Sequence, residues 1–140
     1  MKKINIIFSL VLIFTLFSCK EDAKKYNNLY QRGKQESNIK LLQKGYEKAE
    51  PYFSKLCLFE LCNLLPKQKS VELAEKALKK YPDSQDVLEL LVSLLYEQRE
   101  YLEVISEIDE NSHIKQNNEL KRYYFSAKIK TSKSQQISWE

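Results

Sequence analysis

Glycine, proline and histidine are scarce in this chain of 140 residues, which has two glycines, three prolines and one histidine. Hairpins and β-sandwiches need turns rich in glycine and proline, so this scarcity argues against an all-β fold. No glycine-rich phosphate-binding loop can be built, because Gly33 and Gly45 are the only glycines. Leucine, lysine and glutamate are frequent instead, and they favour helices with short connections. The sequence therefore predicts an all-α fold.

The charges of the chain nearly cancel. It has 23 Lys and Arg against 19 Asp and Glu, and Lys2 and Lys3 belong to the basic set. Removing a leader that contains these two lysines leaves 21 basic against 19 acidic side chains. Such a small excess of positive charge does not indicate a nucleic-acid-binding protein. We expect no nucleic-acid partner.

Few residues suited to catalysis or metal binding are present. Cys57 and Cys62 lie five positions apart, and on one helix they are separated by a rise of about 7.5 Å, too far for a disulfide. They are expected to be buried hydrophobic residues unless the helix breaks between them. With His113, which lies in a polar connection, they do not make a zinc site. Acidic residues alternate with lysine as on solvated faces. The sequence predicts no enzyme, metal or cofactor.

The N-terminus carries a targeting signal. A basic Met1-Lys2-Lys3 precedes an apolar run from Ile6 to Phe17, which is too short to span a membrane and is typical of a signal peptide. Leu16-Phe17-Ser18-Cys19 resembles the lipobox of bacterial lipoproteins, although Phe17 is bulkier than the usual residue. The resemblance implies that residues 1–18 are removed and that Cys19 is lipidated through its sulfur. An uncleaved anchor or a plain signal peptide is the alternative.

Residues 19–25 are highly charged and are predicted to form a lipidated tether. Within it, Lys20-Glu21-Asp22 resembles the lysine-then-acidic tag for surface export of lipoproteins in the Bacteroidota; a solvated linker is the alternative. We expect a lipid-anchored protein of a bacterial membrane, with the outer membrane and the cell surface both open. The acyl chains on Cys19 would supply about 0.8 kcal/mol of membrane affinity per buried CH₂.

Apolar residues recur at helical spacing through the rest of the chain. The predicted domain covers residues 26–131, and residues 132–140 are predicted to be a flexible tail. Gly33 is expected to end a first helix, and Gly45 to weaken or shorten the second. Seven helices are expected, namely residues 23–32, a helix capped by Ser37 or Asn38, Pro51 to Leu65, Lys69 to Lys80, Gln85 to Glu97, Glu100 to Glu110, and a helix capped by Asn117 or Asn118.

The pattern of the fifth and sixth of these helices is similar to the tetratricopeptide (TPR) repeat. Leu88, Leu91, Val92 and Leu95, followed by Val104 and Ile108, have that repeat's spacing, and Ala77 and Pro82 stand where its small residue and closing proline belong. The turn glycine of the family is absent at Gln98-Arg99. The resemblance implies antiparallel helix pairs stacked as a short TPR-like solenoid, and an irregular α-helical bundle is the alternative.

TPR-like solenoids bind peptide segments in a groove, so the resemblance implies a protein–protein interaction module. It places Asp86, Glu89, Ser93 and Tyr96 on the groove face of the fifth helix. The partner is expected to be an unknown protein of the cell envelope. The alternative is a structural or immunity-type lipoprotein without a peptide groove. A basic C-terminal segment that includes Lys121 and Lys128 could face anionic lipid or an acidic partner, or be a solvated cap.

Overall fold

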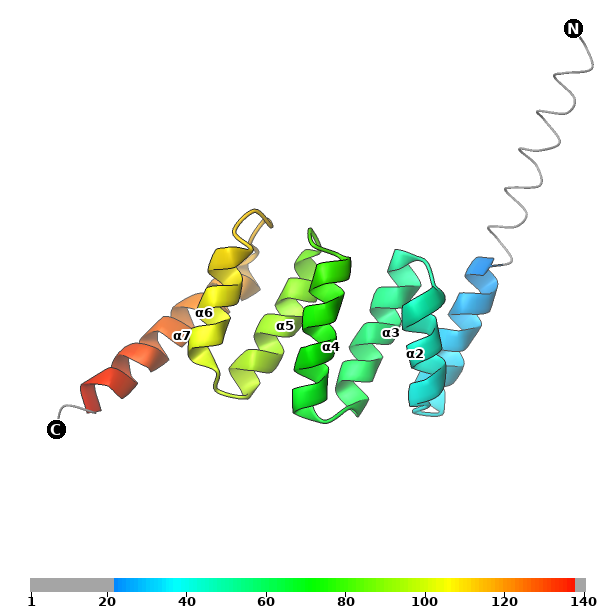
Figure 1. Ribbon diagram of the computed structural model, residues 1–140, viewed down its shortest axis with the longest axis horizontal. Helices are drawn as coiled ribbons and strands as arrows, with labels where there is room; N and C mark the ends of the chain where they lie inside the picture. Colours follow the sequence, from blue (N-terminus) through cyan, green and yellow to red (C-terminus); the bar gives the residue numbers. More distant parts are fainter. Residues whose placement is uncertain (1–21, 138–140) are drawn as a thin grey trace, which may run out of the picture. The chain divides into compact units, whose positions relative to one another are not determined.

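The computed structural model describes residues 22–137. Every regular element in this range is a helix, so the predicted all-α fold is confirmed (Figure 1). The predicted signal peptide, the lipidation site Cys19 and the tail residue Trp139 lie outside the described residues. Residues 22–35 are helical and precede α2 (Ile39–Lys48), α3 (Pro51–Leu64), α4 (Lys67–Lys80), α5 (Gln85–Glu97), α6 (Tyr101–Glu110) and α7 (Asn118–Ile137).

The chain divides into two compact units, one ending at Leu61 and the other beginning at Cys62. Both boundary residues belong to α3. The sequence predicted a single domain over residues 26–131. It also predicted a tail from residue 132, and that boundary lies inside α7, which continues to Ile137.

In the first unit, the connection between the first two helices differs from the prediction. The first helix runs through Gly33, which is buried, and ends at a reversal in which Ser37 has a φ of 48°. The N–H of Asn38 donates to the carbonyl of Gly33 at 2.8 Å, closing a Schellman motif. Asn38 also caps α2, because its side-chain oxygen accepts from the N–H of Leu41 at 3.2 Å. The prediction that Gly33 ends the first helix was wrong, whereas the prediction that Asn38 caps the second helix is confirmed.

Gly45 does not shorten α2, which continues to Lys48. Its role is to let two helices approach closely. A Cβ added at Gly45 would lie 2.5 Å from the Sγ atom of Cys57 on α3, far inside van der Waals contact. Both residues are buried. The glycine therefore costs the helix about 1 kcal/mol of stability relative to alanine, but it permits tight packing between α2 and α3.

A buried serine near the start of a helix binds the preceding helix in each unit. The Oγ of Ser54 on α3 donates to the carbonyl of Tyr46 on α2 at 2.6 Å. The Oγ of Ser70 on α4 donates to the carbonyl of Cys62 on α3 at 2.9 Å. Both serines are 0% exposed, and each binds the carbonyl eight residues upstream. The hydroxyls thus satisfy carbonyl groups in the last turns of α2 and α3.

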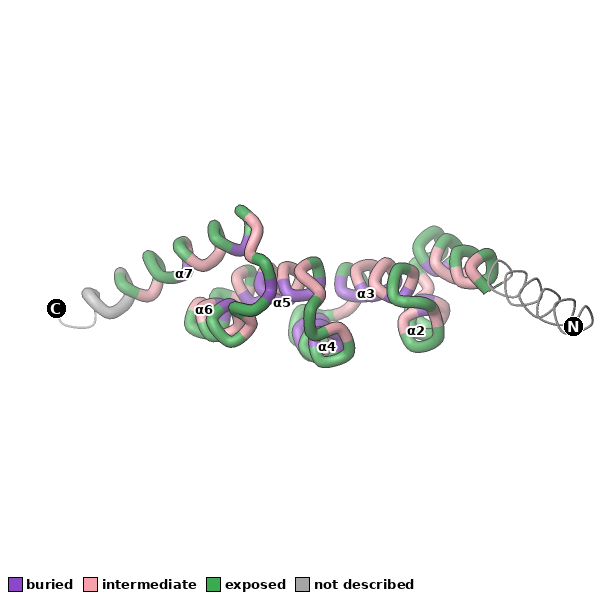
Figure 2. Tube along the Cα trace, turned by 90° about the horizontal axis from the view of Figure 1, so that it is seen from above, coloured by how far each residue is buried: buried purple, intermediate pink, exposed green. Residues whose placement is uncertain are grey.

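In the second unit, α4, α5, α6 and α7 follow one another side by side, and their connections lie at alternating ends (Figure 1). Each helix packs on the next, and α5 also packs on α7. This succession is consistent with the predicted repeat-like stacking of antiparallel helices. Figure 2 shows buried positions where α4 and α5 face each other. The central helix, α5, buries five apolar residues, Val87, Leu88, Leu91, Val92 and Leu95.

The connection between α5 and α6 has the same kind of turn as the one at Ser37. Arg99 has a φ of 66°, in the left-handed region that favours glycine. Its N–H donates to the carbonyl of Tyr96 at 3.0 Å, and the N–H of Glu100 donates to the carbonyl of Leu95 at 3.0 Å. These bonds form a second Schellman motif. Arginine therefore occupies a turn position at which glycine is favoured.

Replacing Arg99 by glycine is expected to stabilise the protein by about 0.5 to 1 kcal/mol. The substitution removes the strain of a side chain at positive φ, partly offset by the greater entropy of unfolded glycine. Denaturant unfolding measures the change. Glu97→Gly is the matched control, because Glu97 is the last residue of α5 and glycine there should lower stability. Equal effects of the two substitutions would contradict the role given to Arg99.

Candidate functional site

The four residues predicted to line a groove lie along one side of α5. Asp86 is exposed, whereas Glu89, Ser93 and Tyr96 are half-buried. Asp86 accepts from the N–H of Val87 at 3.1 Å, close to the start of the helix. The hydroxyl of Ser93 donates to the carbonyl of Leu90 in its own helix at 2.8 Å. These two side chains have local hydrogen-bond partners on α5.

Glu89 and Tyr96 make contacts beyond α5. A carboxylate oxygen of Glu89 accepts from the amide nitrogen of Asn117 at 2.7 Å, and the side-chain oxygen of Asn117 caps α7. The ring of Tyr96 packs against Tyr101 at 5.3 Å and Tyr123 at 5.2 Å between ring centroids. These rings belong to α6 and α7. Two of the four predicted groove residues thus help to fix α7 on α5.

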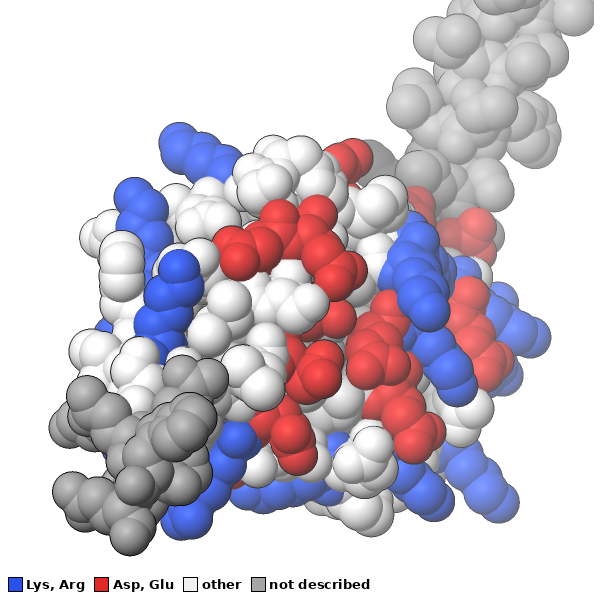
Figure 3. All heavy atoms as spheres, turned by 60° about the vertical axis from the view of Figure 1, so that its left-hand side comes forward, with Lys and Arg blue, Asp and Glu red and all other residues white. Residues whose placement is uncertain are grey.

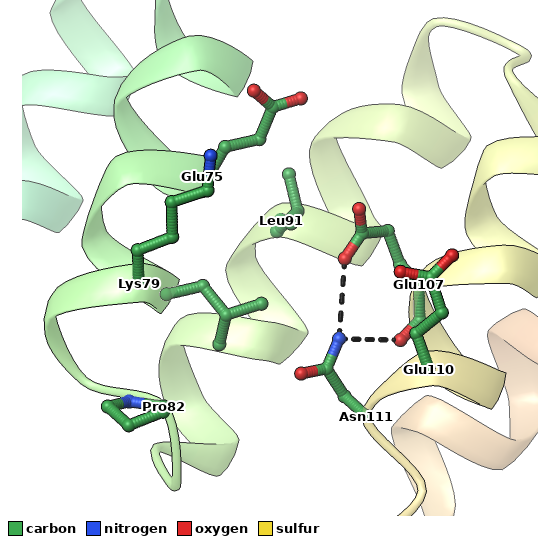
Figure 4. A pocket seen from close by; sticks show the side chains of 8 residues that line it. Glu75, Lys79, Pro82, Leu91, Glu107, Glu110 and Asn111 are labelled. Carbon is green, nitrogen blue, oxygen red and sulfur yellow. Dashed lines mark hydrogen bonds between the residues drawn. The ribbon is translucent and has the colours of Figure 1, made fainter.

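A cleft lies on the opposite side of α5. It has a volume of about 340 Å³ and opens between α4 and α6 (Figure 4). Leu91 of α5 lies between the two walls, with Glu75 and Lys79 on α4 and Glu107 and Glu110 on α6. Leu78, Pro82 and Asn111 complete the lining. The cleft combines an apolar base with a charged rim, as ligand-binding sites in proteins often do.

The rim of the cleft is acidic. Glu75, Glu107 and Glu110 face a single cation, Lys79, in its lining. Figure 3 shows acidic side chains gathered in a band on one face, with lysine and arginine to either side. Asn111 donates from its amide nitrogen to the backbone carbonyl of Glu107 at 2.8 Å and to its carboxylate at 3.4 Å. The site therefore has excess negative charge next to apolar surface.

Glu107 is the carboxylate most affected by this environment. Burial raises its pKa, and the nearby charges of Glu110, Glu75 and Glu103 raise it further, while Lys79 opposes the shift. The ionised form of Glu107 is thus disfavoured in the folded protein. A cation placed in the cleft would relieve this repulsion.

Glu107→Gln is expected to stabilise the protein at neutral pH. The pKa of Glu107 is raised in the folded state, so its contribution to stability is fully present below the ordinary carboxyl pKa and is lost as the pH rises through the folded value. The gain from glutamine should therefore be largest at neutral pH and vanish in acid. Denaturant unfolding across this pH range measures it. A gain that is independent of pH, or one equalled by Glu72→Gln outside the cleft, would contradict this electrostatic account.

This cleft was not predicted from the sequence, because its walls come from separate helices. One signal was present, however. No lysine or arginine occurs from residue 100 to residue 114, whereas Glu103, Glu107 and Glu110 recur at helical spacing there. The expectation that acidic residues alternate with lysine does not hold for α6. A helix with carboxylates along one side and no cations indicates an acidic surface.

Neither the two cysteines of α3 nor His113 belongs to the cleft. Cys57 and Cys62 are free and buried, on an unbroken α3, so their prediction as buried hydrophobic residues is confirmed. Burial raises the pKa of both thiols to about 11, which makes them unreactive at neutral pH. His113 is exposed in the connection between α6 and α7, with Nε2 3.3 Å from the carbonyl of Pro82.

Within residues 22–137, no group of three or more His, Cys, Asp or Glu side chains is arranged to hold a metal ion. In the same range, no helix has both the length and the hydrophobicity needed to cross a bilayer.

Comparisons of the chain with protein-family models, with curated proteins and with solved structures found no match.

Proposed function

We propose that this chain is a lipid-anchored protein–protein interaction module of a bacterial cell envelope. The lipobox-like Leu16-Phe17-Ser18-Cys19 supports the anchor, and the successive packing of helices in the second unit supports the interaction module. Stacked helices of this kind present extended surfaces to partners. The proposed function is binding, with no chemical step.

The observation that carries the proposal is the acidic cleft between α4 and α6. Its base is apolar at Leu78 and Leu91, and its rim has three carboxylates against one lysine. A lysine side chain complements this cleft, because its aliphatic stem covers apolar surface while its ammonium group binds carboxylates. We therefore propose that the cleft receives a lysine of the partner protein. Glu107, whose pKa is raised by burial and further by its acidic neighbours, would gain the most from a cation bound beside it.

The face of α5 that carries Asp86, Glu89, Ser93 and Tyr96 is the second candidate surface. The helical-repeat arrangement favours it, since such arrays bind peptides along corresponding helices. However, Glu89 and Tyr96 already contact residues of α7. A partner would find only part of this face available, and for this reason the cleft ranks first.

The anchor is tested by Cys19→Ala. This variant should lose incorporation of labelled fatty acid and be released from membranes, whereas Cys57→Ala should keep both because Cys57 is buried in the folded domain. Unchanged labelling of Cys19→Ala would contradict the lipoprotein proposal.

The cleft is tested by carbodiimide crosslinking in native membranes, which joins a carboxylate to an amine in contact with it. Mass spectrometry should map the linkage from Glu75, Glu107 or Glu110 to a lysine of another protein. Replacing all three by glutamine should abolish this crosslink. The control replaces Glu72, Glu97 and Glu103, outside the cleft lining, and should retain it.

Crosslinks confined to Asp86 or Glu89 would transfer the binding site to the α5 face. A complete absence of crosslinked partners at both surfaces would favour the structural or immunity-type alternative.

A further inference from the structure

The outward side of α7 is apolar at its centre. Leu120 and Ala127 are 0% exposed and mark the side of α7 that packs on its neighbours. Successive residues of a helix turn by about 100°, so Phe125 and Ile129 point away from that buried side. Phe125 is 62% exposed and Ile129 is 56% exposed, and they are one helical turn apart. We call this side of α7, with its flanking cations, the outer face of α7.

Cations flank the two exposed apolar residues. Lys121, Arg122 and Lys128 are all exposed and lie within one turn of Phe125. Glu119 is the one acidic residue in the sequence of α7, and it is paired with Arg122 at 2.7 Å. Lys128 has its ammonium nitrogen 4.3 Å from the centroid of the Tyr124 ring, and the hydroxyl of Tyr124 donates to Asp109 of α6 at 3.4 Å. The outer face is therefore a basic amphipathic surface.

We propose that the outer face of α7 rests on an anionic membrane surface. In that position Phe125 and Ile129 would enter the headgroup boundary, and Lys121 and Lys128 would bind lipid phosphates. The alternative occupant, an acidic protein, fits less well. The outer face has five residues, Lys121, Arg122, Phe125, Lys128 and Ile129, far fewer than the roughly 20 residues that each side of a stable protein interface contributes.

This inference rests on the proposed membrane anchor. Free in solution, so small a surface would bind a bilayer weakly. A chain held at the bilayer by its N-terminus meets the lipid surface at a high effective concentration, so a weak second contact becomes populated without any additional protein. Each cation near an anionic bilayer multiplies the binding constant about fivefold. The lipid anchor and the outer face of α7 would then attach the protein to the same membrane at two points.

The test uses the full chain, reconstituted into vesicles of phosphatidylcholine alone or of phosphatidylcholine with phosphatidylglycerol. Trp139 is the single natural tryptophan, so Trp139→Phe combined with Ile129→Trp gives one indole on the outer face. Bromine-labelled lipids should quench this indole in the vesicles that contain phosphatidylglycerol, and added salt should remove the quenching. Flotation of the chain with vesicles of phosphatidylcholine alone is measured in parallel and reports the anchor.

Charge reversal supplies the matched controls. Lys121→Glu with Lys128→Glu should lower the ratio of docked to free α7 at least about 25-fold, by the loss of two cations. Lys69→Glu with Lys76→Glu on α4 makes the same charge change at the same spacing on exposed residues and should leave quenching unchanged. If the first pair disturbs folding, as circular dichroism would show, Lys121→Glu alone should still lower the ratio about fivefold or more.

The outcomes separate this inference from the proposed function. Flotation without quenching would overturn the docking of α7 and leave the anchor intact. Quenching equal in both kinds of vesicle would overturn the recognition of anionic lipid. Loss of flotation would contradict the anchor itself. Quenching that requires an added acidic protein would assign the outer face to a protein partner instead.

Discussion

Leu91→Asp is expected to unfold the second unit. Leu91 is 0% exposed, lies on α5 at the base of the cleft, and is bordered by the carboxylates of Glu75, Glu107 and Glu110. An aspartate there loses the burial of a leucine side chain and places a further negative charge in an acidic environment. The expected loss is at least about 4 kcal/mol of unfolding free energy. Circular dichroism and denaturant unfolding measure it.

Leu102→Asp is the control for this substitution. Leu102 lies on α6 in the same unit but is 68% exposed, so the same chemical change should alter stability by no more than about 0.5 kcal/mol. Lower pH should partly restore the stability of the Leu91→Asp protein by protonating the new carboxylate. A stable, fully helical Leu91→Asp protein at neutral pH would show that α5 does not pack as described.

Gly45→Ala is expected to destabilise the first unit by about 1 to 3 kcal/mol, although alanine is the better helix former. The new Cβ would lie 2.5 Å from the Sγ of Cys57, and an overpacked core must shift to make room. Lys44→Ala, an exposed change on the same helix, should alter stability little. Thermal unfolding compares the two.

Cys57→Ala should rescue Gly45→Ala, because it removes the sulfur atom that the new methyl group meets. In a double-mutant cycle the two changes together should cost less than the sum of the single costs. Additive costs would mean that the two positions do not touch. A stabilising Gly45→Ala would mean that helix propensity, and not close approach, governs this position.

Local signals in the sequence located the helices well. The bounds predicted for α5, Gln85 to Glu97, agree with the structure, because an apolar pattern at helical spacing is bordered there by Pro82 and by a polar turn. Asn38 could also be predicted as a helix cap, since a side-chain oxygen just before a helix satisfies a free N–H group. These features depend only on neighbours in the chain.

The predictions failed where residues that are distant in the sequence determine the local structure. Gly33 was expected to end its helix and Gly45 to weaken or shorten its own, but each glycine makes room for a side chain of another helix, Leu42 and Cys57 respectively. The acidic cleft likewise joins α4 and α6, which the sequence separates by α5. Only the lack of cations on α6 was available to predict it.

The two buried thiols give each unit its own internal probe. Cys57 belongs to the first unit and Cys62 to the second, although they are only five residues apart on α3. A buried thiol with a pKa of about 11 is alkylated only when its surroundings open. In variants that keep one of the two thiols, the alkylation rate would therefore report the opening free energy of one unit. Equal rates would mean that the two halves of α3 open as a single cooperative segment.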